Sequence, residues 1–423
     1  MSKRAKAVLL AVSLALVLFA VIGGLGVKAS TNDGAYRQLG VYSEVLERIR
    51  REYVEDPKMT AVTDGALHGL LESLDANSSY LTPAEFKQFK SYTRDGRGTV
   101  GATISKRFGY AAVVSVIPDG PADKAGLAEG DILEAIEGQS SRQIPLAEIH
   151  SILDGAPGTS VTVSVVRPRR AEPVKTVITR EVLPTPPMTE KMLEDGVGYV
   201  QVEAFSKGSA QEIAGKIKSL QKAGAKKLIL DLRHVSAGEE SEGIATANLF
   251  LDHGTIAYLE GQKFPRQTFT ADPNKAVTNL PLVVLVNRGT GGPAELVAAS
   301  ILDNARGDVL GDKTFGIGSV QKTIDLPDGA GLILTVAKYH SPSGKAIQDT
   351  AVTPNILVAD KDTDFASPDE DRDENPNEPL KKEKRTGPDE QLRRAIEVLK
   401  NGDNSAPAPA TNTASTAENP VGH

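Results

Sequence analysis

Apolar side chains in the first hundred residues recur at the spacing of helices. Six of them between positions 39 and 49 fall close to every 3.6 residues, and a second apolar run predicts a helix over residues 64–74. Thr82, followed by Pro83 and a glutamate, has the composition of a capping box and predicts the start of a third helix. We therefore expect a helical N-terminal region over residues 35–96.

The pattern changes after this region. Valine and isoleucine gather at 113–117 and 161–166 and predict strands, whereas residues 144–153 predict a helix. Residues 97–183 are thus expected to form a small β-rich domain with one prominent helix. A Pro-Thr-Pro-Pro stretch at 184–187 predicts a stiff boundary behind it.

Beyond that boundary, residues 188–358 alternate between two kinds of segment. Continuous apolar runs predict buried strands, and longer amphipathic segments between them predict helices. Such alternation is typical of an α/β domain with crossover connections. The strands are predicted at 197–202, 228–232 and 282–286, and the helices at 210–223, 243–251 and 294–303.

The C-terminal part carries a different composition. Residues 359–388 hold an acidic and then a basic run with several prolines, which predicts a charged linker. A short amphipathic helix is predicted at 389–400. The Ala-, Thr-, Asn- and Pro-rich residues 401–423 are expected to form a disordered tail.

The first 29 residues predict a membrane segment. Three cations precede an uncharged run from Ala7 to Val27, and a bilayer-spanning helix needs ~20 apolar residues. Cleaved signal peptides have apolar cores of only ~7–15 residues, so we favour a signal anchor over a signal peptide or a buried helix. The basic flank favours a cytoplasmic start. We expect membrane attachment through residues 1–29, with the bulk of the chain in the periplasm or another extracytoplasmic space.

Composition narrows the classes of partner and chemistry. The chain has 48 Lys+Arg against 55 Asp+Glu, and this net charge of −7 argues against nucleic acid as a partner. It has no cysteine, which excludes disulfides and thiolate metal sites, and only 4% aromatic residues, which argues against stacking platforms. The six histidines are scattered without a His-Glu-x-x-His pair. We expect no metal and no cofactor.

Several separate motifs point together to one family. They are Leu74-Asp75-Ala76-Asn77-Ser78-Ser79-Tyr80-Leu81, Gly120 to Leu133, Asp231-Leu232-Arg233, Thr314-Phe315-Gly316 with Gly318-Ser319-Val320-Gln321, and Tyr339 to Pro342 with Gly344 and Ile347. With these motifs the chain resembles the C-terminal processing peptidases, which are tail-specific serine proteases with a PDZ domain. The resemblance covers roughly residues 35–400. It implies an α/β multidomain fold with an N-terminal helical region, an inserted PDZ β-domain and a crotonase-like α/β protease core.

The PDZ resemblance implies a site for peptide tails. A PDZ domain adds an extended peptide to a sheet edge and holds its terminal carboxylate on backbone N–H groups. The family's carboxylate loop corresponds to Thr99 to Ala102, where a glycine allows close backbone approach. The alternative is that the apolar residues around this loop only fill the domain core. The expected peptide-binding residues are Val100, Gly101, Ala102, Ile104, Ile149 and Leu153.

The same resemblance implies that the catalytic pair of the family is missing. The family uses a serine nucleophile with a lysine as its general base, and Glu295 fixes the register of the serine motif. The nucleophile position is then Gly292 and the base position, 25 residues further on, is Ile317. A backbone N–H after the serine serves as oxyanion donor, but Pro293 has none. The Asn-Pro-Gly-Gly turn is replaced by Val235 to Gly238, whereas Gln321, which supports the lysine in the family, is retained.

Three functional hypotheses follow. The first is a proteolytically inactive homologue that binds C-terminal tails of unfolded or envelope proteins as a scaffold, or as an adaptor for an active paralogue. The second is an active serine-type endopeptidase with relocated residues, such as Thr290 or Ser319 with Lys313 or Lys322. The third is a structural envelope protein whose PDZ domain does not bind peptide.

Overall fold

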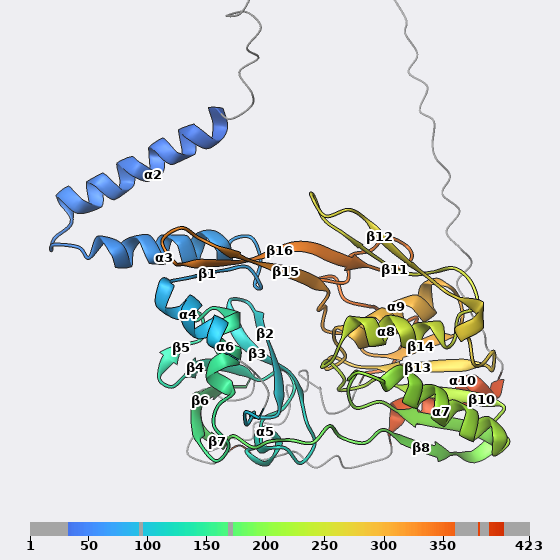
Figure 1. Cartoon of the computed structure of the whole chain (residues 1–423). Helices are drawn as coiled ribbons and strands as arrows, with labels where there is room; N and C mark the ends of the chain where they lie inside the picture. Colours follow the sequence, from blue (N-terminus) through green and yellow to red (C-terminus); the bar gives the residue numbers. More distant parts are fainter. Residues whose placement is uncertain (1–32, 93–95, 168–171, 360–379, 381–388, 402–423) are drawn as a thin grey trace, which may run out of the picture. The chain divides into compact units, whose positions relative to one another are not determined.

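The computed structural model of the chain describes residues 33–92, 96–167, 172–359, 380 and 389–401 (Figure 1). The chain divides into two compact units, up to Ala66 and from Leu67 onward. The predicted membrane segment and the predicted tail beyond residue 401 lie outside the described residues. Across the residues that are described, no helix is both long enough and apolar enough to cross a bilayer.

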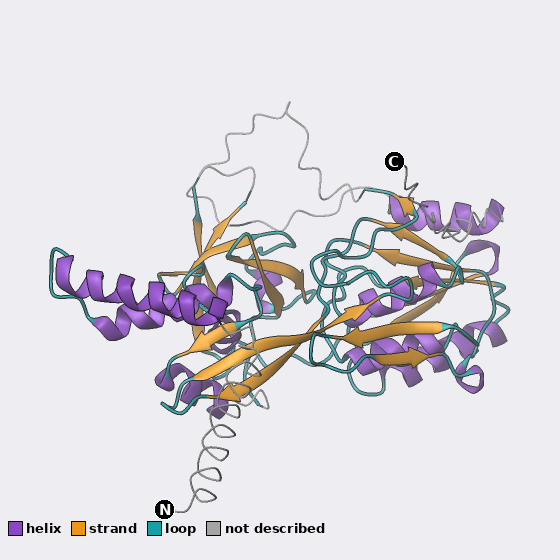
Figure 2. Cartoon of the chain, turned by 90° about the horizontal axis from the view of Figure 1, so that it is seen from above, coloured by secondary structure: helices purple, strands orange, loops and turns teal. Residues whose placement is uncertain are grey.

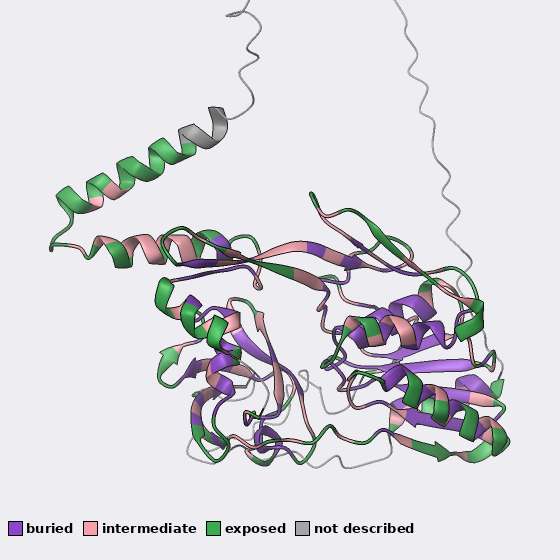
Figure 3. Ribbon diagram, in the orientation of Figure 1, coloured by how far each residue is buried: buried purple, intermediate pink, exposed green. Residues whose placement is uncertain are grey.

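Two helices account for the start of the described chain. Helix α2 (Asp33–Glu52) confirms the predicted first helix, and its apolar side chains at Leu39 and Val45 are exposed (Figure 3). Helix α3 (Met59–Glu72) begins five residues before the predicted 64–74. Within its first turn the Thr63 hydroxyl donates to the Met59 carbonyl at 2.9 Å.

The predicted third helix is also confirmed. Helix α4 (Pro83–Ser91) begins at Thr82, whose side chain accepts a hydrogen bond from the Glu85 N–H. The Glu85 carboxylate in turn accepts from the Thr82 N–H at 2.7 Å, which completes the capping box.

The β-rich region forms one antiparallel sheet in the order β2-β3-β4-β6-β7, with β5 paired to β4. Strand β6 alternates between buried valines and half-exposed residues, as a strand with one face on a core should. Helix α6 begins two residues after the predicted position 144 because Pro145 occupies its N-cap. The elements are β2 (Ala102–Arg107), β3 (Tyr110–Val116), α5 (Pro121–Lys124), β4 (Ile132–Ile136), β5 (Gln139–Ser140), α6 (Leu146–Leu153), β6 (Ser160–Val166) and β7 (Val174–Thr179).

The α/β region contains a six-stranded sheet in the order β17-β14-β13-β10-β9-β8, parallel except at β8–β9. Helices cover both of its faces (Figure 2). Strand β10 shows why the apolar runs are continuous, since Leu228 and Leu230 face one core cluster and Ile229 faces the other. The strands are β8 (Thr189–Met192), β9 (Val197–Gln201), β10 (Lys227–Asp231), β13 (Leu282–Val286), β14 (Asp308–Gly311) and β17 (Ile356–Leu357).

The helices of this region match their predicted positions within three residues. They are α7 (Ser209–Lys222), α8 (Glu240–Asn248), α9 (Pro293–Asp303) and α10 (Glu390–Asn401). Within the predicted linker 359–388, the structure describes residues 359 and 380. Leu380 is buried in the core cluster of the small β-rich domain.

A second, antiparallel sheet was not predicted from the sequence. Its path runs β1-β16-β11-β12, and β15 pairs with the other edge of β16. These strands mix polar and apolar side chains without a regular alternation, so their pattern did not indicate strands. They are β1 (Ser79–Leu81), β11 (Thr255–Glu260), β12 (Gln267–Thr270), β15 (Ser319–Asp325) and β16 (Gly331–His340).

Candidate functional site

Gly292 lies where strand β13 gives way to helix α9. Its backbone has φ 56° and ψ −123°, a left-handed conformation that L side chains rarely adopt. A Cβ atom at this position would meet only the Ser236 carbonyl oxygen, at 3.5 Å, so the fold leaves room for a side chain. Pro293 follows as the first residue of α9 and provides no N–H to this space.

Ile317 lies beside the same turn. Its Cδ1 is 3.2 Å from the point where a Cβ on Gly291 would stand, so the side chain at 317 already points at the loop that carries Gly292. The structure therefore brings together the two positions, 292 and 317, that sequence register assigned to the nucleophile and the base. Neither side chain can attack a carbonyl or accept a proton.

Glu295 joins the two loops. Its buried carboxylate accepts from the N–H groups of Gly292 at 3.1 Å, of Ile317 at 2.8 Å and of Gly316 at 2.8 Å. The Thr314 hydroxyl also donates to it. Burial raises the pKa of Glu295 to about 7, against the opposing effect of these four donors. Sequence analysis used this residue only to set the register and missed that it links both loops.

The turn over residues 235–238 packs against the loop that carries Gly291 and Gly292. The Gly291 N–H donates to the Val235 carbonyl at 2.9 Å, and the Ser236 Cβ is 3.0 Å from the Cβ position of Gly291. Gly238 has φ 133°, and a Cβ there would stand 2.3 Å from the Phe205 carbonyl oxygen. Only glycine fits position 238, which explains the retained glycine at the end of an otherwise altered turn.

Thr290, the alternative nucleophile, is fully buried and fixed by its own hydrogen bonds. Its hydroxyl donates to the Leu232 carbonyl at 2.8 Å and accepts from the Asn287 N–H at 3.0 Å. Lys313 and Lys322 are exposed. Within the described part of the chain, no hydrogen bond joins Thr290 to a lysine.

A polar network holds Gln321 and Ser319. The Gln321 amide donates to the Ser319 hydroxyl at 2.8 Å, and the Asn77 amide donates to that same hydroxyl at 3.1 Å. Asp75 accepts from the Thr335 hydroxyl at 3.0 Å and from the Asn77 N–H at 2.8 Å. This network ties the Leu74–Leu81 motif to strands β15 and β16, which explains why its polar residues form one motif.

The small β-rich domain touches this site through two contacts that sequence analysis missed. Glu129 lies 2.5 Å from His234 Nδ1, and its other oxygen accepts from the Asn287 amide at 3.3 Å. The hydroxyls of Ser115 and Ser236 lie 2.5 Å apart, and both side chains are buried. These contacts place the altered turn against the neighbouring domain.

The six expected peptide-binding residues gather around β2 and α6, which contact each other. Val100, Ile104, Ile149 and Leu153 are buried in one core cluster, and Ala102 packs against it. Gly101 has φ 75°, and a Cβ there would stand 2.8 Å from Leu183 Cδ1, so glycine is required. The four buried side chains fill the core of the domain, as the alternative interpretation expected. The loop at 99–102 has a glycine with positive φ, as expected for a loop whose backbone N–H groups bind a carboxylate.

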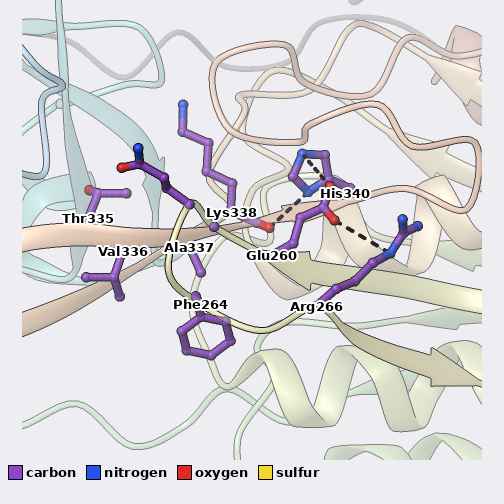
Figure 4. A pocket seen from close by; sticks show the side chains of 10 residues that line it. Glu260, Phe264, Arg266, Thr335, Val336, Ala337, Lys338 and His340 are labelled. Carbon is purple, nitrogen blue, oxygen red and sulfur yellow. Dashed lines mark hydrogen bonds and ion pairs between the residues drawn. The ribbon is translucent and has the colours of Figure 1, made fainter. Parts of the chain in front are cut away.

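One hollow of about 510 Å³ lies away from these residues, between the turn after β11 and strand β16 (Figure 4). Glu260 forms an ion pair there with Arg266 at 3.6 Å. Figure 4 shows Phe264 and the charged side chains around the open space. None of the sequence-assigned site residues lines it.

Comparison with known proteins defines the class to which this fold and site belong. A model of a PDZ domain matches residues 113–167, and a model of peptidase family S41 matches residues 196–358. The chain is 30% identical to a carboxy-terminal-processing protease of Bartonella bacilliformis, over 80% of this chain and 79% of the relative. It is 33% identical to a carboxyl-terminal-processing protease of Picosynechococcus sp., over 75% of this chain and 78% of the relative.

The fold agrees with these matches. A solved structure of the photosystem II D1 C-terminal processing protease superimposes with a TM-score of 0.63 at 25% identity, covering 75% of this chain and 92% of that one. This likeness confirms the α/β multidomain fold with a PDZ β-domain and an α/β protease core. The chain belongs to peptidase family S41 and carries a PDZ domain.

Proposed function

We propose that this S41 family member captures C-terminal protein tails on its PDZ domain and does not hydrolyse them. One observation carries the proposal. The two positions that the family register assigns to nucleophile and base hold Gly292 and Ile317, and both of their N–H groups donate to the one carboxylate of Glu295.

The chemistry of peptide hydrolysis explains why these substitutions matter. A serine-type peptidase needs a nucleophile, a base to remove its proton, and donors for the oxyanion. Gly292 has no side chain and Ile317 cannot titrate. Pro293 lacks the N–H that the family places after the serine. All three requirements are therefore unmet at one site.

A relocated active site has less support. Thr290 already donates its only hydroxyl proton to the Leu232 carbonyl. A working nucleophile would need a base within ~3 Å. The Ser319 hydroxyl accepts from two amides and lies in a network that holds strands together.

Several features support tail binding. Strand β2 is an edge strand, so one side of it can pair with an added peptide. The Val100 N–H donates to no acceptor among the described residues, whereas the neighbouring Gly101 N–H donates to the Thr99 hydroxyl at 3.2 Å. We propose that bound tails come from unfolded or envelope proteins, and that the chain acts as a scaffold or as an adaptor for an active paralogue.

The same proposal includes a location. The basic residues before the run Ala7 to Val27 favour export of the bulk of the chain, with residues 1–29 as a membrane anchor. Periplasmic or extracytoplasmic placement would expose the PDZ domain to exported client proteins.

A binding experiment on the full chain tests this function. Fluorescence anisotropy would follow a labelled peptide with an apolar C-terminus, and mass spectrometry would show whether it stays intact. We expect saturable binding of an intact peptide, loss of binding when the terminal carboxylate is amidated, and loss in Gly101→Ala. Gly138→Ala is the matched control, because Gly138 also has positive φ but nothing within 4 Å of its Cβ position. A cleaved peptide, or no carboxylate dependence, would contradict the proposal.

A further inference from the structure

A basic and aromatic surface lies at the far end of strand β2. We define the hairpin patch as Arg107, Phe108, Tyr110 and Arg142. Arg107 and Arg142 lie over the rings of Phe108 and Tyr110, at 5.7 Å and 5.6 Å from the ring centroids. Phe108 is 86% exposed at the turn between β2 and β3.

The hairpin patch lies on the path that a bound tail would take. A carboxylate held at Gly101 and Ala102 lies at the start of β2. The residues that precede it in the peptide then lie antiparallel to β2 and extend toward Arg107, the last residue of the strand. Arg107 lies five residues after Ala102 (107 − 102) and would be opposite about the sixth residue from the C-terminus of the tail.

The same arginine also reaches the core. The Arg107 guanidinium lies 5.9 Å from the ring of Phe315, whose N–H donates to the Thr290 carbonyl at 2.9 Å. Phe315 is two residues before Ile317. A tail that leaves the PDZ strand here therefore passes the hairpin patch before it reaches the site at Gly292 and Ile317.

The two arginines of the hairpin patch contact aromatic rings, but among the described residues they have no carboxylate partner. In the described parts of the chain, neither Arg107 nor Arg142 forms an ion pair with a carboxylate. The neighbouring Lys106 does so, with Glu72 at 3.6 Å, and its side chain is only 6% exposed. Both arginines are exposed, and they form a locally positive surface that complements acidic side chains.

We propose that the hairpin patch selects C-terminal tails that carry Asp or Glu near the sixth residue from the end. This inference rests on the proposed tail binding and adds a substrate class to it. The carboxylate loop would hold the terminus, and the two arginines would hold the upstream acidic residue.

Anisotropy titrations of the full chain with three matched peptides test the inference. The peptides share an apolar C-terminus and differ at the fifth to seventh residues from the end, which are acidic, the corresponding amides, or lysine. Because each exposed ion pair contributes little, we expect the acidic peptide to bind about threefold to tenfold more tightly than the amide peptide. This preference should shrink when salt rises from about 0.05 M to about 0.5 M.

Two variants separate the patch from the rest of the domain. Arg107→Gln with Arg142→Gln should remove the preference, so that the acidic and the amide peptide bind with equal affinity. Lys175→Gln is the control, because Lys175 is exposed on β7 at the opposite edge of the same sheet. Equal binding of all three peptides, or a preference that survives the double variant, would overturn this inference alone. Absence of binding by any tail would overturn the proposed function along with it.

Discussion

Glu295 shows how one buried side chain connects two loops that are distant in sequence. It lies on α9 yet accepts hydrogen bonds from the loop of Ile317 as well as from Gly292. The carboxylate of Glu295 therefore connects the loop that carries Gly292 with the loop that carries Ile317.

This role predicts a pH-dependent contribution to stability. Burial raises the pKa of Glu295 to about 7 from an ordinary 4.5, so between these values the folded chain binds a proton that the unfolded chain has released. Its contribution to the free energy of unfolding is therefore full at low pH and falls as the pH rises toward 7. We expect Glu295→Gln to cost more stability at pH 5 than at pH 8, by about 2–3 kcal/mol. Urea unfolding at both pH values measures this difference.

The control for this prediction is Glu239→Gln, because Glu239 is exposed and its replacement should cost little stability. An equal cost of Glu295→Gln at pH 5 and pH 8 would show that the carboxylate does not change its protonation on folding.

The catalytic positions lead to a second prediction at the residue scale. Gly292→Ser combined with Ile317→Lys would find space at position 292, although its φ of 56° strains any L side chain there, and position 317 points at the adjacent glycine. We still expect no measurable peptide hydrolysis, because Pro293 supplies no oxyanion donor. Adding Pro293→Ala should raise activity by ~10²-fold or more above that of the double variant. Robust hydrolysis by the double variant alone would contradict this account of the oxyanion site.

At the element scale, helix α10 depends on a buried ion cluster. Arg233 donates to Asp231 at 2.9 Å and to Asp389, just before α10, at 2.9 Å and 2.8 Å. The Asp231 side chain is only 3% exposed, whereas that of Asp389 is 38% exposed.

Replacing the buried Arg233 should therefore lower the free energy of unfolding more than replacing the half-exposed Asp389. We expect Arg233→Met to destabilise the core by about 3–5 kcal/mol, because it leaves the buried Asp231 carboxylate without its cation, although the Tyr199 hydroxyl still donates to it. Asp389→Asn should cost about 1 kcal/mol or less. Hydrogen exchange should show faster exchange in α10 for the arginine variant, and similar exchange in both variants would argue against this cluster as the anchor of the helix.

Helix α4 gives a smaller prediction of the same kind. Thr82→Ala removes the side chain that accepts from the Glu85 N–H, and we expect a loss of about 1 kcal/mol. Denaturant unfolding measures the loss. An unchanged midpoint would mean that the capping box does not contribute to folding.

Strands could be predicted from the sequence where their apolar and polar residues follow a regular pattern. The parallel strands β9, β10 and β13 are buried on both faces and give continuous apolar runs, so their positions were clear. Strand β15 has the sequence SVQKTID, with no buried residue, and its pairing with β16 depends on contacts that the sequence does not display. The second sheet therefore stayed hidden although its polar motifs were recognised.

At the scale of the whole chain, long-range contacts were the least predictable part. Glu129 and His234 are 105 residues apart in sequence, and Ser115 and Ser236 are 121 apart. His234 lies in a turn with φ 65°, and nothing in the sequence pattern indicated its partner. Positions 292 and 317 could be predicted because Glu295 fixes the alignment with the family's serine motif and the two positions keep the family's separation of 25 residues.

The central claim is that this S41 chain binds tails without serine-type hydrolysis. The most direct test is to incubate the purified full chain with an unfolded protein that has an apolar C-terminus, with an active relative as positive control and Thr290→Ala alongside. We predict an intact substrate with both forms of the chain while the control cleaves it. Cleavage by the native chain that disappears in Thr290→Ala would show a rebuilt active site and would contradict this account.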